Sequence, residues 1–140
     1  MIVDVTDLFV YRNALNLTRP VYRLANLVPK SHYKSRVQII NSAESIAPLI
    51  AEGYGKKKSA KEFKRYLEMA MGSSDETITH LRQIKILSET FKNIKPETCD
   101  ALIDRYKILS KQLQNFNQEM ANILNQFSVF RHLSSGRMKI

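Results

Sequence analysis

The stretch that decides the fold is SIAPLIAEGYGKKKSAKEFKRYLEMAMGS, residues 45–73. It ends one apolar run, passes through a Gly-Tyr-Gly turn and three lysines, and begins a second apolar run at Ser59. Ser59 and Glu62 have the Ser-x-x-Glu spacing of a capping box, in which each side chain accepts from a backbone N–H of the first turn. Glycine at the end of an apolar helical run is typical of a left-handed C-cap. The stretch therefore predicts two helices joined by a basic turn.

Apolar residues recur at three- and four-residue steps in four segments, which is the period of amphipathic helices. The segments are residues 6–29, 35–55, 59–92 and 96–127. Short polar links between them favour antiparallel neighbours. We expect one all-α domain, an antiparallel up-down-up-down four-helix bundle over residues 1–127, followed by a basic and flexible C-terminal tail at residues 128–140.

Local features are expected to shape these helices. Thr6, followed by Asp7, is the expected N-cap of the first helix. Pro20 and Pro48 lie inside apolar stripes and are expected to bend their helices, because proline removes a backbone donor. Gly72 lies within the third segment, where glycine costs about 1 kcal/mol relative to alanine. A close approach of another backbone is the expected compensation there.

The composition is that of an ordinary globular chain with a strong positive charge. Of the 140 residues, 44% are hydrophobic and 25% are charged; the net charge is +9 and the pI about 9.8. This charge favours a polyanion such as RNA or DNA, or an anionic membrane face. Cys99 is the only cysteine, which fits a reducing cytoplasm. The N-terminus lacks a signal-peptide pattern, and no run reaches the roughly 20 apolar residues of a membrane span.

Residues that could carry catalysis or bind a metal do not converge in the sequence. Glu76 and His80 lie one helical turn apart, a spacing that more often gives a surface contact than a metal site. Cys99 is better explained as a packed thiol than as a nucleophile. His32 and His132 fall in a linker and in the expected tail. We therefore expect no enzymatic activity, no metal and no cofactor.

Glu52 occupies an unusual position at the end of an apolar helix. An acid there opposes the helix dipole, which favours cations at a C-terminus. One interpretation is a polar anchor that ties the turn to Arg65 or to a neighbouring subunit. The other is a solvated acid, and the sequence leaves both open.

Six cations occur within ten residues around the start of the third helix. Phosphate is attracted by such side chains and by the free N–H groups of a helix N-terminus. The alternative is a solvated turn that aids solubility. Arg82, Lys85, Lys92 and Lys95 lengthen the basic region along the chain. The candidate nucleic-acid contacts are Lys56, Lys57, Lys58, Lys61, Lys64 and Arg65.

A combination of short motifs resembles the ribosomal RNA intervening-sequence protein family of bacterial four-helix-bundle proteins. The family shows Ile-Ala-Glu-Gly, then a Lys-Glu-Phe helix start, then Ala-x-Gly-Ser with a glutamate four residues past the glycine. The matching residues are Ser45, Ile46, Ile50, Ala51, Glu52, Gly53, Lys61, Glu62, Phe63, Ala70, Gly72, Ser73 and Glu76. Gly55 belongs to the same turn. The chain departs from the family pattern at Ala47, Pro48 and Leu49, and at Ile40 and Asn41 in place of paired arginines.

The resemblance implies an antiparallel bundle that assembles into a ring, most often a homopentamer, without known enzymatic activity. Accessory proteins of diversity-generating retroelements are more distantly similar, and they bind nucleic acid and a reverse transcriptase. We expect a non-catalytic, cytoplasmic homo-oligomer that binds structured RNA or DNA and no membrane. The alternative is a protein-protein interaction scaffold, or a reverse-transcriptase accessory protein that does not itself recognise nucleic acid.

Overall fold

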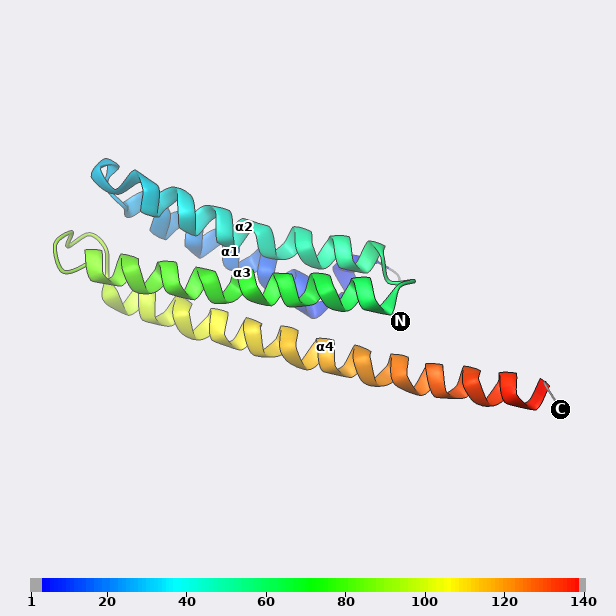
Figure 1. Ribbon diagram of the computed structural model, residues 1–140. Helices are drawn as coiled ribbons and strands as arrows, with labels where there is room; N and C mark the ends of the chain where they lie inside the picture. The colour runs from blue at the N-terminus through cyan, green and yellow to red at the C-terminus, as the bar shows by residue number, and fades with distance from the viewer. Residues whose placement is uncertain (1–3, 139–140) are drawn as a thin grey trace.

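The chain folds into four long helices. A computed structural model describes the backbone of residues 4–138 and the side chains of residues 4–123. Within these residues the α-helices are α1 (Phe9–Leu27), α2 (Tyr33–Gly55), α3 (Ala60–Leu87) and α4 (Pro96–Met138), and there is no strand. Short 3₁₀ turns, η1 (Val5–Asp7) and η2 (Lys30–His32), precede α1 and α2. The helices lie lengthwise against one another (Figure 1), so the expected all-α four-helix class is confirmed.

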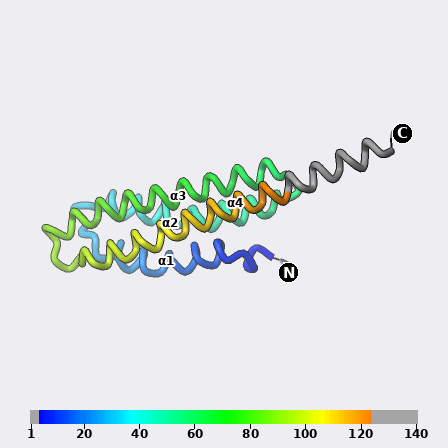
Figure 2. Tube along the Cα trace, turned by 90° about the horizontal axis from the view of Figure 1, so that it is seen from below, coloured from blue at the N-terminus to red at the C-terminus, as the bar shows by residue number. Residues whose placement is uncertain are grey.

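Contacts between the helices fix their relative directions. In each neighbouring pair, rising residue numbers on one helix meet falling numbers on the other, which makes the two helices antiparallel. The pairs that show this are Tyr22–Glu44 and Val28–Arg36 for α1 with α2, Glu52–Tyr66 and Ser42–Thr77 for α2 with α3, Ser74–Ser110 and Lys85–Asp100 for α3 with α4, and Phe9–Phe116 and Asn13–Gln112 for α1 with α4. The α1–α4 contact closes the bundle (Figure 2).

The start of the chain differs from the expectation. Asp4, and not Thr6, is an N-cap: its carboxylate accepts from the Thr6 N–H at 3.2 Å and caps the 3₁₀ turn η1. The α-helix begins later, at Phe9, after Leu8, which makes no side-chain cap. Pro20 and Pro48 lie inside continuous helices. Pro96 is the first residue of α4, as its fixed φ favours.

The core follows the apolar stripe of α4. The stripe is buried along most of the described part of this helix, at Leu102, Tyr106, Leu109, Leu113 and Phe116. Ile123 is 56% exposed, so the stripe loses its cover near that residue. Phe127 and the expected tail, residues 128–140, lie outside the residues whose side chains are described, and the flexibility of that tail stays a prediction.

Small polar residues join the helices through the core. Thr77 on α3 donates to Ser42 on α2 at 2.9 Å, and Ser74 donates to the backbone carbonyl of Tyr106 at 3.2 Å. Ser110 donates to Ser74 at 2.7 Å. These hydroxyls are satisfied across the helix contacts, as buried polar groups require.

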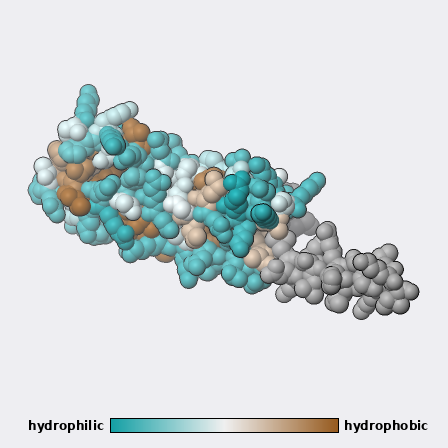
Figure 3. Space-filling model, viewed as in Figure 1, coloured by the Kyte–Doolittle hydropathy of each residue, from teal (hydrophilic) through white to brown (hydrophobic). Residues whose placement is uncertain are grey.

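The outer surface is mostly polar. On the face in Figure 3, hydrophilic residues predominate and apolar areas are small and separate. No helix among the described residues is long and apolar enough to cross a membrane.

Two glycines have opposite surroundings. A Cβ at Gly53 would lie 2.7 Å from the Tyr66 Cβ and 3.3 Å from Phe63 Cδ1, so α2 and α3 meet closely there. A Cβ at Gly72 would meet nothing within 4 Å, and the expected close approach at this residue is therefore wrong. The small residues that do face the core in this part of α3 are Ala70, Ser74 and Thr77.

This contrast predicts opposite effects of the same substitution. Gly53→Ala should lower the free energy of unfolding by about 1–3 kcal/mol, because the new methyl group overpacks the contact with Tyr66. Gly72→Ala should raise it by up to about 1 kcal/mol through helix propensity. Urea denaturation followed by circular dichroism measures both changes. A Gly53→Ala protein as stable as wild type would contradict the close contact.

Candidate nucleic-acid interface

The turn between α2 and α3 has negative φ throughout, and its last residue, Ser59, is extended. The N–H of Lys56 donates to the Gly53 carbonyl at 3.0 Å, and the N–H of Lys57 donates to the Tyr54 carbonyl at 3.2 Å. No described residue has a positive φ, so the expected left-handed glycine cap is wrong. Gly55 ends α2, and a Cβ there would meet nothing within 4 Å. Neither a close neighbour nor the backbone conformation therefore requires glycine at residue 55.

Ser59 caps α3 as expected. Its Oγ accepts from the Glu62 N–H at 3.3 Å. The Ser59 N–H instead donates to the Lys56 carbonyl at 2.9 Å, and the Glu62 carboxylate accepts from Arg65. Only one half of the capping box is formed, because both groups of the other half have different partners.

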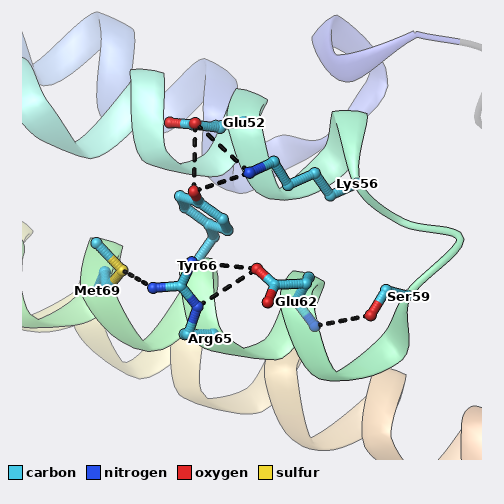
Figure 4. A network of polar contacts seen from close by, with 7 residues as sticks. All are labelled: Glu52, Lys56, Ser59, Glu62, Arg65, Tyr66 and Met69. Atoms are coloured by element: carbon cyan, nitrogen blue, oxygen red, sulfur yellow. Dashed lines mark hydrogen bonds and ion pairs between the residues drawn. The ribbon is translucent and has the colours of Figure 1, made fainter.

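Glu52 is a polar anchor between the two helices. Its carboxylate accepts from the Tyr66 hydroxyl at 3.2 Å, and it lies 3.9 Å from the Lys56 ammonium (Figure 4). The Lys56 ammonium donates to the Tyr66 hydroxyl at 3.1 Å, which closes the triangle. The interpretation of Glu52 as a polar anchor holds, but its partner is different: the Tyr66 hydroxyl, and not Arg65, donates to the Glu52 carboxylate. About half of the Glu52 side chain, 53%, stays exposed.

The contact between Glu52 and Tyr66 follows from the register of the helical hairpin. Glu52 and Tyr66 are equally distant from Ser59, the residue at the turn. Ser42 and Thr77 have nearly the same symmetry and also meet. Residues placed symmetrically about a short turn face each other in antiparallel helices, so this signal was present in the sequence.

Aromatic rings hold part of the cationic cluster. The Lys56 ammonium lies 4.9 Å and the Arg65 guanidinium 4.8 Å from the centre of the Tyr66 ring, and Lys57 lies 3.8 Å from the Tyr54 ring. A cation over an aromatic face within about 6 Å is attracted by its quadrupole. The two tyrosines therefore orient three of the six cations.

Acids compensate two members of the cluster. The Arg65 guanidinium donates to the Glu62 carboxylate at 3.1 Å, and this hydrogen bond raises the pKa of Arg65. The hydrogen bond with Tyr66 raises the pKa of Lys56, and the charge of Glu52 adds a smaller effect. Both cations stay charged at physiological pH, and the two acids nearest the turn are already occupied.

Three lysines of the cluster have no partner within the described residues. Lys58, Lys61 and Lys64 are exposed, and no hydrogen bond, ion pair or ring contact engages them. We call these the free lysines. They lie at the N-terminal end of α3, where the helix dipole adds partial positive charge. The local arrangement thus leaves a cationic surface that can meet phosphate.

Lys85 on α3 and Lys92 in the following turn do not extend this surface. Lys85 forms an ion pair with Asp100 on α4 at 2.9 Å. It lies near the far end of α3, about 30 Å from Arg65 along the helix at the usual rise per residue. Lys92 donates to the Glu89 carbonyl at 2.7 Å, in the following turn. The cluster at the α2–α3 turn is therefore a separate feature.

Other candidate sites show ordinary contacts. His80 lies 3.4 Å from Glu76, and no group of three metal-ligating side chains occurs in the described part of the chain. Cys99 is fully buried, and burial raises the pKa of its thiol. A thiol with these properties is a poor nucleophile.

The fold and the turn together define a basic four-helix-bundle protein with a tyrosine-anchored hairpin. The family model of the 23S rRNA-intervening sequence protein matches residues 6–115. The chain belongs to this family, and the resemblance drawn from its short motifs is confirmed. No curated protein matches the chain.

The anchor makes a specific prediction for Lys56. Tyr66→Phe removes the hydroxyl that accepts from Lys56, so the Lys56 pKa should fall toward its ordinary value of 10.5. Since the folded pKa is raised, the Lys56 contribution to stability is present below pH 10.5 and is lost as pH rises through the folded value. Lysine side-chain NMR measures the pKa. Tyr54→Phe is the matched control and should leave it unchanged; an unchanged value in Tyr66→Phe would contradict the anchor.

Proposed function

We propose that the chain is a non-catalytic, homo-oligomeric protein of the cytoplasm that binds structured RNA or DNA through its phosphate backbone. Within the cluster from Lys56 to Arg65, the free lysines supply the phosphate contacts, and the other cations add positive potential. The observation that carries the proposal is the division of charge at the turn: Glu52 and Glu62 are occupied by neighbours, and the free lysines remain without an acid. A lysine that neutralises a phosphate releases a counterion condensed on the nucleic acid, which favours binding.

Structured RNA is the first ligand class to test. The description of the family refers to an intervening sequence of 23S rRNA. The net charge of +9 supports a polyanionic partner of either kind. Lys56, Lys57 and Arg65 add positive potential beside the free lysines, although their side chains are held by Tyr54, Tyr66 and acids.

Self-association is supported by large apolar side chains that a single chain leaves in contact with water. Tyr33 on α2 is 62% exposed and Ile86 on α3 is 64% exposed. A subunit contact buries such side chains, although apolar residues exposed singly also occur on monomers. The family resemblance adds the expectation of a pentamer.

Charge reversal of the free lysines tests the proposal. Lys58→Glu, Lys61→Glu and Lys64→Glu in one protein should weaken binding to a fluorescein-labelled RNA stem-loop. The slope of log affinity against log salt should become shallower by about 2–3, because each lost phosphate contact removes roughly 0.7–0.9. Fluorescence anisotropy between about 50 and 200 mM salt measures this slope.

One control variant and one measurement of mass complete the experiment. Glu68→Lys on the same helix should not weaken binding, since it adds a cation near the free lysines. Light scattering on the same samples should give a multiple of the 16.2 kDa chain mass. Unchanged RNA binding by the triple variant would overturn the phosphate contact, and a mass of one chain at micromolar concentration would overturn self-association.

A further inference from the structure

A second cationic surface lies on α1, away from the α2–α3 turn. Residues 8–43 contain six lysines and arginines and no aspartate or glutamate. Three of these cations, Arg12, Arg19 and Arg23, are on α1. A segment of this length with charges of one sign produces a local potential that no acid within it offsets.

The three arginines form one line on the helix. Their spacings of seven and four residues place them within about 40° of one another around the axis. The opposite side of α1 is the core, with Ala14, Leu17 and Val21 at most 3% exposed. All three arginines are exposed. We call Arg12, Arg19 and Arg23 the arginine ridge.

No acid among the described residues pairs with the arginine ridge. Arg12 donates to the backbone carbonyl of Thr6 at 2.8 Å, a neutral partner that leaves the guanidinium uncompensated. Arg19 and Arg23 have no ion pair or hydrogen bond with any described residue. An arginine without an acid partner offers its planar fork to a phosphate.

The neighbouring helix α4 adds a polar groove and a fourth arginine. A groove of about 210 Å³ runs between α1 and α4, and Asn13, Asn16, Arg105 and Gln112 contribute its polar lining. Asn13 donates to Gln112 at 2.9 Å across it. Asn16 also lies between Arg12 and Arg19 on the ridge, so the groove borders the ridge directly. Arg105 forms no ion pair, although Asp104 precedes it in the chain.

We propose that the phosphate backbone of an RNA or DNA strand lies along the arginine ridge and contacts Arg105 at its edge. This inference rests on the proposed function, that the chain binds nucleic acid, and assigns to it a second surface. Arginine forks bind phosphate bidentately, and the amides of Asn13 and Asn16 supply donors for phosphate or sugar oxygens. Arg12 to Arg23 spans about 16 Å, the length of roughly five stacked nucleotides at 3.4 Å each.

The ridge begins at the end of the bundle that carries the basic turn. Phe9 on α1 contacts Phe116, which also contacts Phe63 at the start of α3. The 3₁₀ turn η1 at the start of the chain contacts α2, the helix that leads into the basic turn. Figure 2 shows α1 running beside α4 from this end. The ridge and the basic turn therefore begin at the same end of the bundle, on helices α1 and α3 that are not direct neighbours.

A nucleic acid suits this surface better than a membrane. A helix that lies on a membrane buries an apolar face beside its cations. The ridge is bordered by Asn16 and Asn26 and also by Leu15 and Tyr22, which are 44% and 43% exposed. The main apolar side of α1, with Leu17 and Val21, is packed in the core. Cations and amides at regular helical steps match a chain of phosphates and sugars.

The test neutralises the two ridge arginines that have no partner, together with Arg105, and compares an equal loss of charge elsewhere; Arg12 is kept because it donates to the Thr6 carbonyl. The ridge variant carries Arg19→Gln, Arg23→Gln and Arg105→Gln; the matched control carries Lys30→Gln, Lys34→Gln and Lys95→Gln near the opposite end of the bundle. Both lose three positive charges. Labelled RNA and DNA stem-loops of one sequence are titrated by anisotropy at several salt concentrations, and circular dichroism verifies that each variant is folded.

The ridge variant should lower the salt slope by about 2–3, beyond the change seen in the control, because three phosphate contacts are lost. A third protein with Arg19→Lys, Arg23→Lys and Arg105→Lys should recover most of that slope. The comparison of RNA with DNA shows which backbone is preferred. A ridge variant equal to the control, or one that loses only binding to phosphatidylserine vesicles, would overturn the inference.

The result also separates this inference from the proposed function. If the charge-reversed free lysines weaken binding and the ridge variant does not, the proposed function stands and the ridge is not a contact. If the wild-type protein binds neither stem-loop even at low salt, the proposed function fails and the ridge inference fails with it.

Discussion

The close contact between α2 and α3 at Gly53 is the constraint on which the site depends. Any side chain at residue 53 would lie within 2.7 Å of the Tyr66 Cβ. Because the two backbones meet there, the Tyr66 hydroxyl reaches Glu52 and its ring lies beside Lys56 and Arg65. A wider separation would break this anchor. Helix packing at one small residue therefore sets the positions of the charges around the turn.

As a consequence, only some of the cations at the turn have an acid as a partner. Glu52 and Glu62 are held by groups on either side of the turn, and they compensate Lys56 and Arg65. Lys58, Lys61 and Lys64 are then left without an acid at a helix N-terminus. When a lysine without an acid partner binds a phosphate, no ion pair within the protein has to be broken. The electrostatic attraction between the two charges is therefore not offset by the loss of such a pair. The arginine ridge shows the same property on a different helix, where the sequence supplies no acid at all.

Much of the fold could be predicted from apolar spacing, because a stripe such as that of α4 from Leu102 to Phe116 has to be buried. Ser59 was identified as a cap for a local reason, its spacing to Glu62. One error concerned tertiary distance: close approach occurs at Gly53 and not at Gly72. Two were local: no described glycine is left-handed, and Asp4, not Thr6, is the N-cap at the start of the chain. The contact between Glu52 and Tyr66 is set by the register of the hairpin, which a search for local motifs does not include. The arginine ridge on α1 is not a local motif either, because its members are spread over three helical turns.

The central claim is that the free lysines, and not the anchored ones, meet phosphate. Lysine side-chain NMR during titration with an RNA stem-loop tests it most directly, since each ammonium is observed separately. We expect the signals of Lys58, Lys61 and Lys64 to shift with increasing RNA, while that of Lys56 stays close to its position because Tyr66 and Glu52 hold it. Equal shifts for all four lysines, or no shift for the three free ones, would contradict the account.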